Sequence, residues 1–151
     1  MVYEAHDRAK VRALQEALTA LLPAWFARPD ANRHYAAQAE ILPAWIATLD
    51  GADRGLLLLK RHGLLSAAIY WMAVHPGYHR HGIGRALIEA VAAAMTGEGR
   101  RFLFVCTLGE DNNDARYART RRFYQRQGFV LGVTEHGGGP DGLSYYVSLL
   151  H

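Results

Sequence analysis

The sequence predicts a single α/β domain in which one β-sheet is covered by helices. Three observations lead to this prediction. Apolar residues alternate between helical and strand spacing along the chain, 151 residues suffice for one core but not for two, and no internal repeat, linker or low-complexity segment is present. Elements of this kind can all join one sheet with helices on its faces. We therefore expect residues 1–151 to form one domain.

The first half of the chain reads as two helices followed by three strands. Apolar residues recur at intervals of three and four before Pro23, the pattern of an amphipathic helix that a proline ends. Asp50-Gly51 is typical of a tight hairpin turn. The near-continuous apolar run before His75 is typical of a central strand that is covered on both faces. The expected elements are helices over 8–22 and 31–42 and strands over 44–49, 54–62 and 65–74.

The second half reads as helix, strand, helix and two strands. One apolar stripe starts at Ile83 and its helix ends among Gly97 and Gly99, since glycine commonly follows a helix C-terminus. A second helical pattern stops at Gly128. The remaining expected elements are a helix over 114–127 and strands over 100–108, 129–136 and 143–150.

Composition excludes several classes of protein. No apolar run approaches the roughly 20 residues that a membrane span needs, and the N-terminus lacks the apolar core of a signal peptide, so we expect no membrane association and a cytoplasmic location. The single cysteine, Cys106, cannot form an intramolecular disulfide, which fits a reducing compartment. The net charge of +3, with fifteen Arg and two Lys, does not by itself indicate a nucleic-acid partner.

The most informative segment is AVHPGYHRHGIGRALIEAV, residues 73–91, in which a strand runs through a short loop into a helix. The first backbone N–H groups of a helix lack intrahelical partners and carry a partial positive charge, so they suit phosphate oxygens. Gly82 and Gly84 would allow a ligand to approach the backbone closely, and Arg80 and Arg85 could add charge at the rim. Glycines alone would equally fit a plain turn before a helix.

The spacing in this segment resembles the coenzyme A motif of the GCN5-related N-acetyltransferases (GNAT), Val-x-Pro-x-Tyr-Arg/Gln-x-x-Gly-x-Gly/Ala. It matches at five positions, Val74, Pro76, Tyr78, Gly82 and Gly84. The Arg/Gln position is His79, which has fewer hydrogen-bond donors than arginine, so we expect weaker or pH-dependent diphosphate binding. The resemblance implies a diphosphate site made of His79, Arg80, His81, Gly82, Ile83, Gly84 and Arg85.

A second motif lies about forty residues later, in YARTRRFYQRQGFV. It resembles the GNAT phrase Phe-Tyr-x-x-x-Gly-Phe, which places a tyrosine beside the coenzyme A sulfur, and Tyr124 matches that tyrosine. Tyr117 and Thr120 share its helix face, and by the resemblance we expect Tyr117 to contact coenzyme A, although the family often has Asn and Ala at these two positions. The alternative reading makes Tyr124 a core aromatic residue. The neighbouring stripe of Arg119, Arg122 and Arg126 is interpreted as a solvated surface.

The resemblance covers the chain from about Trp45 to its end and implies both fold and activity. It implies a mixed, mostly antiparallel sheet of six to seven strands flanked by about four helices, whose fourth and fifth strands splay apart. The pantetheine of acetyl-coenzyme A would lie in that gap and bond to the backbone around Met72, Ala73 and Val74. The implied reaction is transfer of the acetyl group to a primary amine of a small molecule or peptide. Tyr124 would act as the general acid, since a phenol can protonate a departing thiolate.

The general base is missing from the pattern, because the strand SAAIYWMAV, residues 66–74, carries no carboxylate. Glu110, Asp111 and His75 are candidates that would act through water, and a non-catalytic domain that binds coenzyme A is the main alternative. A nucleic-acid-binding protein is the weaker alternative, since no aromatic set accompanies the arginines. A homodimer is possible. No metal is expected, because no carboxylate lies near the histidines at 75, 79 and 81.

The loop GGGPDG, residues 137–142, joins the last two strands. Its glycine content permits unusual backbone angles, and we expect it to border the acceptor site. An exposed hairpin loop without function is the equally open alternative.

Overall fold

The computed structural model describes residues 1–109, 114–136 and 142–151. Its strands are β1 (Val2–Ala5), β2 (Ala44–Leu49), β3 (Ala52–His62), β4 (Ser66–Val74), β5 (Phe102–Leu108), β6 (Val130–Glu135) and β7 (Leu143–Leu149). Its α-helices are α1 (Arg8–Leu21), α2 (Pro29–Ala39), α3 (Ile83–Gly97) and α4 (Ala115–Arg126). A short 3-10 helix, Pro76–Tyr78, precedes α3.

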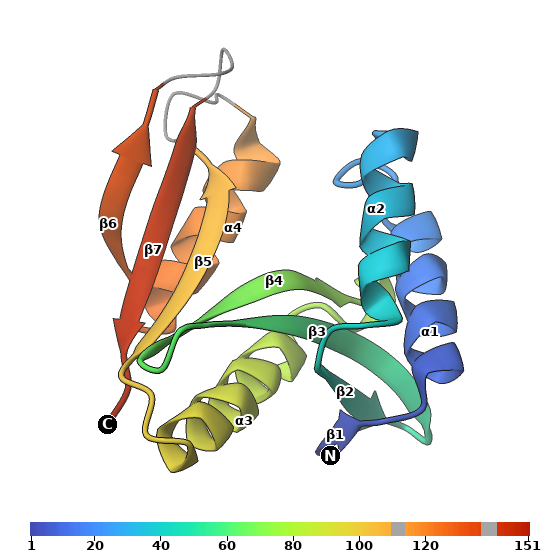
Figure 1. The fold of residues 1–151 in the computed structure, drawn as a ribbon. Helices are drawn as coiled ribbons and strands as arrows, with labels where there is room; N and C mark the ends of the chain where they lie inside the picture. The colour runs from blue at the N-terminus through green and yellow to red at the C-terminus, as the bar shows by residue number, and fades with distance from the viewer. Residues whose placement is uncertain (110–113, 137–141) are drawn as a thin grey trace. The chain divides into compact units, whose positions relative to one another are not determined.

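The strands form one seven-stranded mixed sheet in the order β1-β2-β3-β4-β5-β7-β6 (Figure 1). β4 and β5 pair in parallel, whereas β1 with β2, β2 with β3, β5 with β7 and β6 with β7 pair antiparallel. The predicted fold class is thereby confirmed. The described residues divide into two compact units, one of Met1–Lys60 with Tyr70–Ala94 and one of Arg61–Ile69 with Met95–His151.

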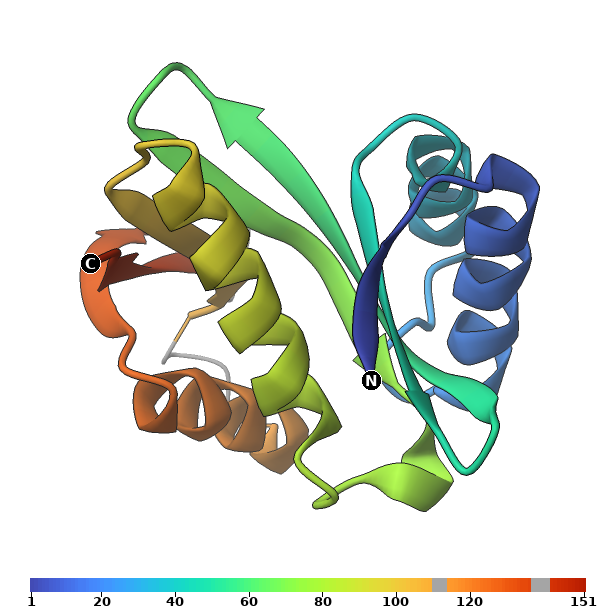
Figure 2. The ribbon, with the colours of Figure 1, turned by 90° about the horizontal axis from the view of Figure 1, so that it is seen from below.

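One strand and one helix of the first unit differ from the prediction. β1 was not predicted, because four residues are too few to show a periodicity, and it forms only by pairing with β2 (Figure 2). α2 begins at Pro29 and ends at Ala39, rather than running over 31–42. Proline suits the first turn of a helix because the N–H that it lacks has no helical partner there. The Asp50-Gly51 hairpin turn is confirmed, with φ of 54° and 75° at the two residues.

The core of the first unit lies between one face of its strands and the helices α1 and α2. Val11 and Leu18 of α1 and Ala39 of α2 are at most 1% exposed, and they pack with Leu56 and Leu58 of β3. Five further cluster members come from β1, β2 and β4: Ala5, Ala44, Ile46, Trp71 and Ala73. The Phe26 ring stacks on Trp71 with a centroid distance of 5.3 Å. These contacts hold α1 and α2 against β4.

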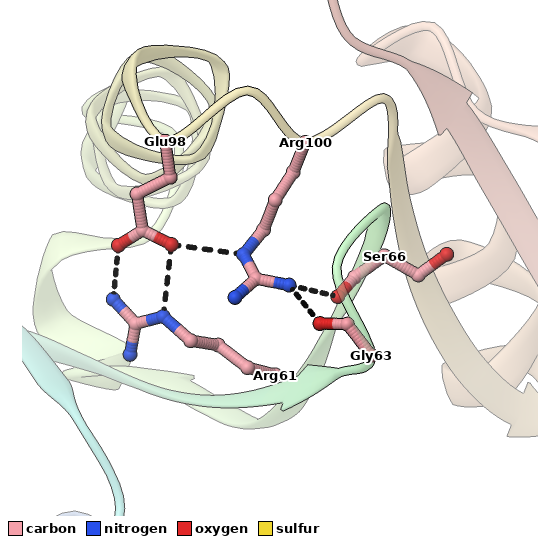
Figure 3. Close-up of polar contacts among 5 residues, drawn as sticks. All are labelled: Arg61, Gly63, Ser66, Glu98 and Arg100. Carbon is pink, nitrogen blue, oxygen red and sulfur yellow. Dashed lines mark hydrogen bonds and ion pairs between the residues drawn. The ribbon is translucent and has the colours of Figure 1, made fainter.

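In the second unit, an ion-pair network links the turn after β3 to the end of α3 (Figure 3). The Glu98 carboxylate accepts hydrogen bonds from Arg61 and, at 2.8 Å, from Nε of Arg100. Nη1 of Arg100 donates in turn to the carbonyl oxygens of Gly63 and Ser66, at 2.6 and 3.0 Å. The two guanidinium groups hold the pKa of Glu98 well below its usual range, at about 2.

Candidate functional site

The loop between β4 and α3 presents backbone N–H groups at the start of a helix. β4 ends at Val74, the chain turns through the 3-10 helix, and α3 begins at Ile83 (Figure 2). The N–H of Ala86 donates to the carbonyl oxygen of Gly82 at 3.0 Å, which is the first bond of the helical ladder. The N–H groups of residues 83–85 therefore precede that ladder and carry the partial positive charge of the helix N-terminus.

The backbone of this loop takes up left-handed conformations at two positions. Arg80 has a φ of 66° and Gly82 a φ of 77°. A side chain in this region costs about 1 kcal/mol, and glycine avoids that cost. A Cβ atom at Gly82 would meet nothing within 4 Å, so the space beside its backbone is open. The loop thus combines N–H donors with room for a ligand close to the main chain.

The start of α3 is held close to β3 by a second glycine. A Cβ atom at Gly55 would lie 2.8 Å from Cγ2 of Ile83 and 3.1 Å from Cδ1 of Leu87. Contacts shorter than about 3 Å are repulsive, so only glycine allows this approach. Gly55 therefore helps to position the N-terminus of α3, a role that the sequence analysis did not assign.

The three histidines of the loop make local contacts. Nε2 of His79 lies 2.9 Å from the carbonyl oxygen of Val74, so this ring is turned back toward the end of β4. Nδ1 of His75 accepts a 3.0 Å hydrogen bond from the N–H of Gly77, and the His81 ring lies 5.7 Å from that of Tyr78. Over the ranges 1–109, 114–136 and 142–151, no group of three His, Cys, Asp or Glu side chains could hold a metal ion.

The arginines around the loop differ in their partners. Nε of Arg85 pairs with the Glu89 carboxylate at 2.7 Å, so part of its charge is already compensated on α3. Arg80 is exposed. Arg54 of β3 lies over the Tyr78 ring, 4.1 Å from its centroid, a cation–π geometry that fixes the 3-10 turn against β3. Arg54 is a contributor to the loop that the sequence analysis missed.

The three predicted pantetheine-contacting residues form the last part of β4. Ala73 is buried, whereas Met72 and Val74 are half-buried. The parallel pairing of β4 with β5 runs from Ser66 opposite Phe102 to Ile69 opposite Val105. Residues 72–74 thus lie beyond the last of these pairs.

Tyr124 is buried on α4, with 6% of its surface exposed. Its ring meets those of Phe123 and Phe129 edge-on, at centroid distances of 5.2 and 5.5 Å. Burial raises the pKa of the Tyr124 hydroxyl, because the charged phenolate would lose its hydration. The side chain therefore stays protonated at neutral pH, as a proton donor must.

The other predicted residues of α4 divide into two faces. Tyr117 and Thr120 are half-buried, and the Thr120 hydroxyl donates to the carbonyl oxygen of Arg116 at 3.1 Å. The predicted arginine stripe is exposed, in agreement with its interpretation as a solvated surface: Arg119, Arg122 and Arg126.

A buried arginine on α4 was missed by the sequence analysis. Arg121 is 8% exposed, and its Nη1 donates to the carbonyl oxygens of Leu108 and Gly109, both at 3.0 Å. Its spacing was a usable signal, since Arg121 follows Tyr117 by four residues and precedes Tyr124 by three, which places it on their helix face. Arg121 ties α4 to the end of β5.

Comparison with known protein families identifies the family that has both the loop between β4 and α3 and the tyrosine-containing helix α4. A family model described as an acetyltransferase (GNAT) domain matches residues 41–131, which include the whole loop from β4 to α3 and all of α4. The chain belongs to the GNAT acetyltransferase family. The resemblance that the two motifs predicted is therefore confirmed. A search of curated protein sequences found no match to this acetyltransferase.

Solved structures of GNAT acetyltransferases share the fold over the whole chain. A GNAT-family protein from Desulfovibrio desulfuricans superposes with a TM-score of 0.79 at 22% identity, covering 100% of this chain and 99% of that one. An aminoglycoside 6'-N-acetyltransferase complexed with coenzyme A gives 0.75 at 13% identity, covering 100% and 97%. The ribosomal-protein-S18-alanine N-acetyltransferase of Escherichia coli gives 0.74 at 18% identity, covering 99% and 93%. At these identities the likeness establishes the fold of the GNAT acetyltransferase and not its acceptor.

Two sequence-based predictions for this acetyltransferase fall outside the described residues. They are the carboxylates Glu110 and Asp111 and the loop residues 137–141. Gly142, the last residue of the predicted acceptor loop, has a φ of 60°, and a Cβ atom there would lie 2.6 Å from the carbonyl oxygen of Glu135. Among the described helices, none is both long and apolar enough to cross a membrane.

Proposed function

We propose that this acetyltransferase moves an acetyl group from acetyl-coenzyme A to a primary amine of a small molecule or peptide, and that residues 1–151 act as one catalytic domain. The observation that carries the proposal is the loop from β4 to α3. Its open space beside Gly82, its left-handed backbone at Arg80 and Gly82, and the N–H groups of residues 83–85 at the start of α3 suit a diphosphate.

The residues present fit coenzyme A, although not all through their side chains. Backbone N–H groups of Ile83, Gly84 and Arg85 would bind the diphosphate, and the exposed Arg80 would add positive charge. His79 contacts the Val74 carbonyl oxygen, so we assign it to shaping the loop as well as to the diphosphate. The backbone of residues 72–74 would hold the pantetheine by strand-like hydrogen bonds.

In the proposed reaction the bound donor supplies an activated acetyl thioester, and the protein places and protonates the reacting groups. A backbone N–H at Ala73 or Val74 polarises the thioester carbonyl, as the family resemblance implies. Tyr124 donates its proton to the departing thiolate, a role that the family resemblance implies and for which the hydroxyl is protonated at neutral pH. Tyr117 and Thr120 line the same face of α4.

Two similar structures support the proposed class of acceptor. The similar structures include an enzyme named for an aminoglycoside amine and one named for an alanine of a ribosomal protein. The aminoglycoside and the alanine each carry an amine on an aliphatic carbon, and we propose an acceptor of this kind. The lack of a carboxylate on β4 favours one competing function, a coenzyme A-binding domain without turnover.

The experiment has a binding arm and a turnover arm. Coenzyme A at about 100 times its Kd should stabilise the protein by about 2.7 kcal/mol. For a chain of this size that corresponds to a rise in Tm of about 5–10 °C. Release of free thiol from acetyl-coenzyme A would then be followed with kanamycin, spermidine and an Ala-Arg-Tyr tripeptide. Stabilisation without thiol release above the hydrolysis rate would favour the binding domain, and no stabilisation would refute the proposal.

A further inference from the structure

A histidine of α2 and a tyrosine of β4 form a hydrogen-bonded pair that neither motif contains. Nε2 of His34 lies 2.7 Å from the hydroxyl oxygen of Tyr70. Tyr35 meets the Tyr70 ring edge-on at a centroid distance of 5.7 Å, and it lies 6.1 Å from the His34 ring. Tyr35 and Tyr70 are half-buried against the core cluster, whereas His34 is exposed. The tyrosine hydroxyl is thus held in place by an imidazole that can exchange protons with water.

The position of Tyr70 along β4 relates this pair to the bound donor, and this step rests on the proposed function. The diphosphate site follows the end of β4, so a pantetheine that bonds to residues 72–74 runs backward along the strand. Its thiol end then approaches the residues that precede Met72. Tyr70 is two residues earlier, which is about 7 Å along the strand.

Acetylation of an amine requires a group near the thioester that can take a proton from the amine. Aliphatic amines are mostly ammonium ions at neutral pH, with pKa values of about 8 to 10, and only the neutral amine is a nucleophile. β4 carries no carboxylate that could take the proton. Imidazole is the side chain whose ordinary pKa lies closest to neutral pH. A general base can take a proton directly or through one bridging group that passes the proton on.

We propose that Tyr70 and His34 deprotonate the acceptor ammonium. The Tyr70 oxygen accepts a proton from the ammonium while its own proton passes to Nε2 of His34, so that the hydroxyl is regenerated and an imidazolium forms. The neutral amine attacks the thioester carbonyl carbon, the C–S bond breaks, and the sulfur leaves as the thiol. His34 then returns its proton to water. The products are the acetylated amine, free coenzyme A and one proton.

The surroundings of the pair agree with this relay. The titratable groups in contact with the His34 ring are Tyr35 of its own helix and Tyr70 of β4. Asp30, one turn earlier on α2, lies 3.8 Å from the guanidinium of Arg28. Burial and, secondarily, the neighbouring Tyr35 raise the pKa of Tyr70. Tyr70 therefore keeps its proton between turnovers and passes a proton on without holding a negative charge.

The test is the pH dependence of kcat/KM in His34→Gln and Tyr70→Phe, with the best accepted of kanamycin, spermidine and the Ala-Arg-Tyr tripeptide. Glutamine preserves a hydrogen bond to Tyr70 but cannot take a proton. We expect both variants to lose about a hundredfold at pH 7. The loss should shrink as pH rises and vanish near the pKa of the amine, where neutral amine is abundant. His62→Gln, at the exposed end of β3, is the matched control and should follow the parent.

Each result decides between the relay and its alternatives. A loss of equal size at every pH would show a purely structural role and overturn the proposal, as would an unchanged kcat/KM. The KM for acetyl-coenzyme A and the rise in Tm with coenzyme A should be unchanged in both variants. A parent that coenzyme A does not stabilise would instead refute the proposed function itself, so the two failures are distinguishable.

Discussion

The buried guanidinium of Arg121 donates a 3.0 Å hydrogen bond to the carbonyl oxygen of Leu108, at the end of β5. A second bond of the same length reaches Gly109. A buried charged group is costly unless it is hydrogen-bonded, and here two backbone oxygens accept from Nη1 of the guanidinium. The helix that carries Tyr124 is consequently attached to the strand beside it through one side chain, three residues away.

Removal of this attachment should destabilise the protein. Arg121→Met keeps most of the apolar contact but removes the guanidinium donor from the Leu108 and Gly109 carbonyl oxygens, of which the Leu108 oxygen keeps another donor, the Thr107 hydroxyl. Loss of a donor to a buried carbonyl oxygen typically costs about 1–3 kcal/mol. We expect Tm to fall by several degrees in a thermal unfolding experiment, about 2–4 °C for each kcal/mol. Arg122→Met, on the exposed face of the same helix, should change stability by less than about 0.5 kcal/mol. Equal effects of the two substitutions would contradict the role assigned to Arg121.

Substitution of Gly82 should abolish coenzyme A binding without unfolding the protein. Gly82→Glu fills the open space beside the backbone and places a negative charge where the diphosphate would bind. The rise in Tm with coenzyme A should disappear. Gly63→Glu is the control, because Gly63 also has a positive φ, 62°, and nothing within 4 Å of its Cβ position. The control should show the same backbone strain but keep the response to coenzyme A.

Loss of the Tyr124 hydroxyl should affect turnover and not donor binding. Tyr124→Phe keeps the ring that packs against Phe123 and Phe129 and removes only the proton donor. We expect kcat to fall about a hundredfold, or about 2.7 kcal/mol of transition-state stabilisation. Steady-state kinetics would be measured beside coenzyme A dissociation constants from calorimetry. An unchanged kcat in single-turnover experiments would make Tyr124 a packing residue.

The ion pairs of Glu98 should stabilise the folded protein at neutral pH and lose this effect in acid. Arg61 and Arg100 depress the pKa of Glu98 from 4.5 to about 2 in the folded protein. The stabilisation is therefore complete above about pH 4.5 and is lost as pH falls toward 2. Because the carboxylate is more than a third exposed, we expect less than about 1 kcal/mol. Glu98→Gln should lower Tm at pH 7 and match the parent near pH 2; a difference that persists in acid would exclude the ionic explanation.

Local chemistry made much of this protein predictable from its sequence alone. The Asp50-Gly51 turn, the helix ends at Gly99 and Gly128 and the loop glycine Gly82 all require a positive φ, and the structure has one at each. Such positions can be predicted from the sequence because a turn or a helix end restricts the backbone angles of only a few neighbouring residues. The two GNAT motifs belong to the same category, since each lies within one loop or one helix.

The tertiary structure alone decided which distant residues meet. β1 exists because Val2 to Ala5 pair with Ala44 to Ala47 of β2, far away in the sequence. Arg121 is buried because its donors reach the end of β5, and His34 bonds to Tyr70 across 36 residues of sequence. The spacing of residues along the chain does not predict such contacts, because they depend on how helices pack on strands. The sequence by itself therefore determined the family and singled out the loop to which we assign the diphosphate, whereas the packing of α2 on β4 placed a histidine beside a tyrosine that the motifs do not include.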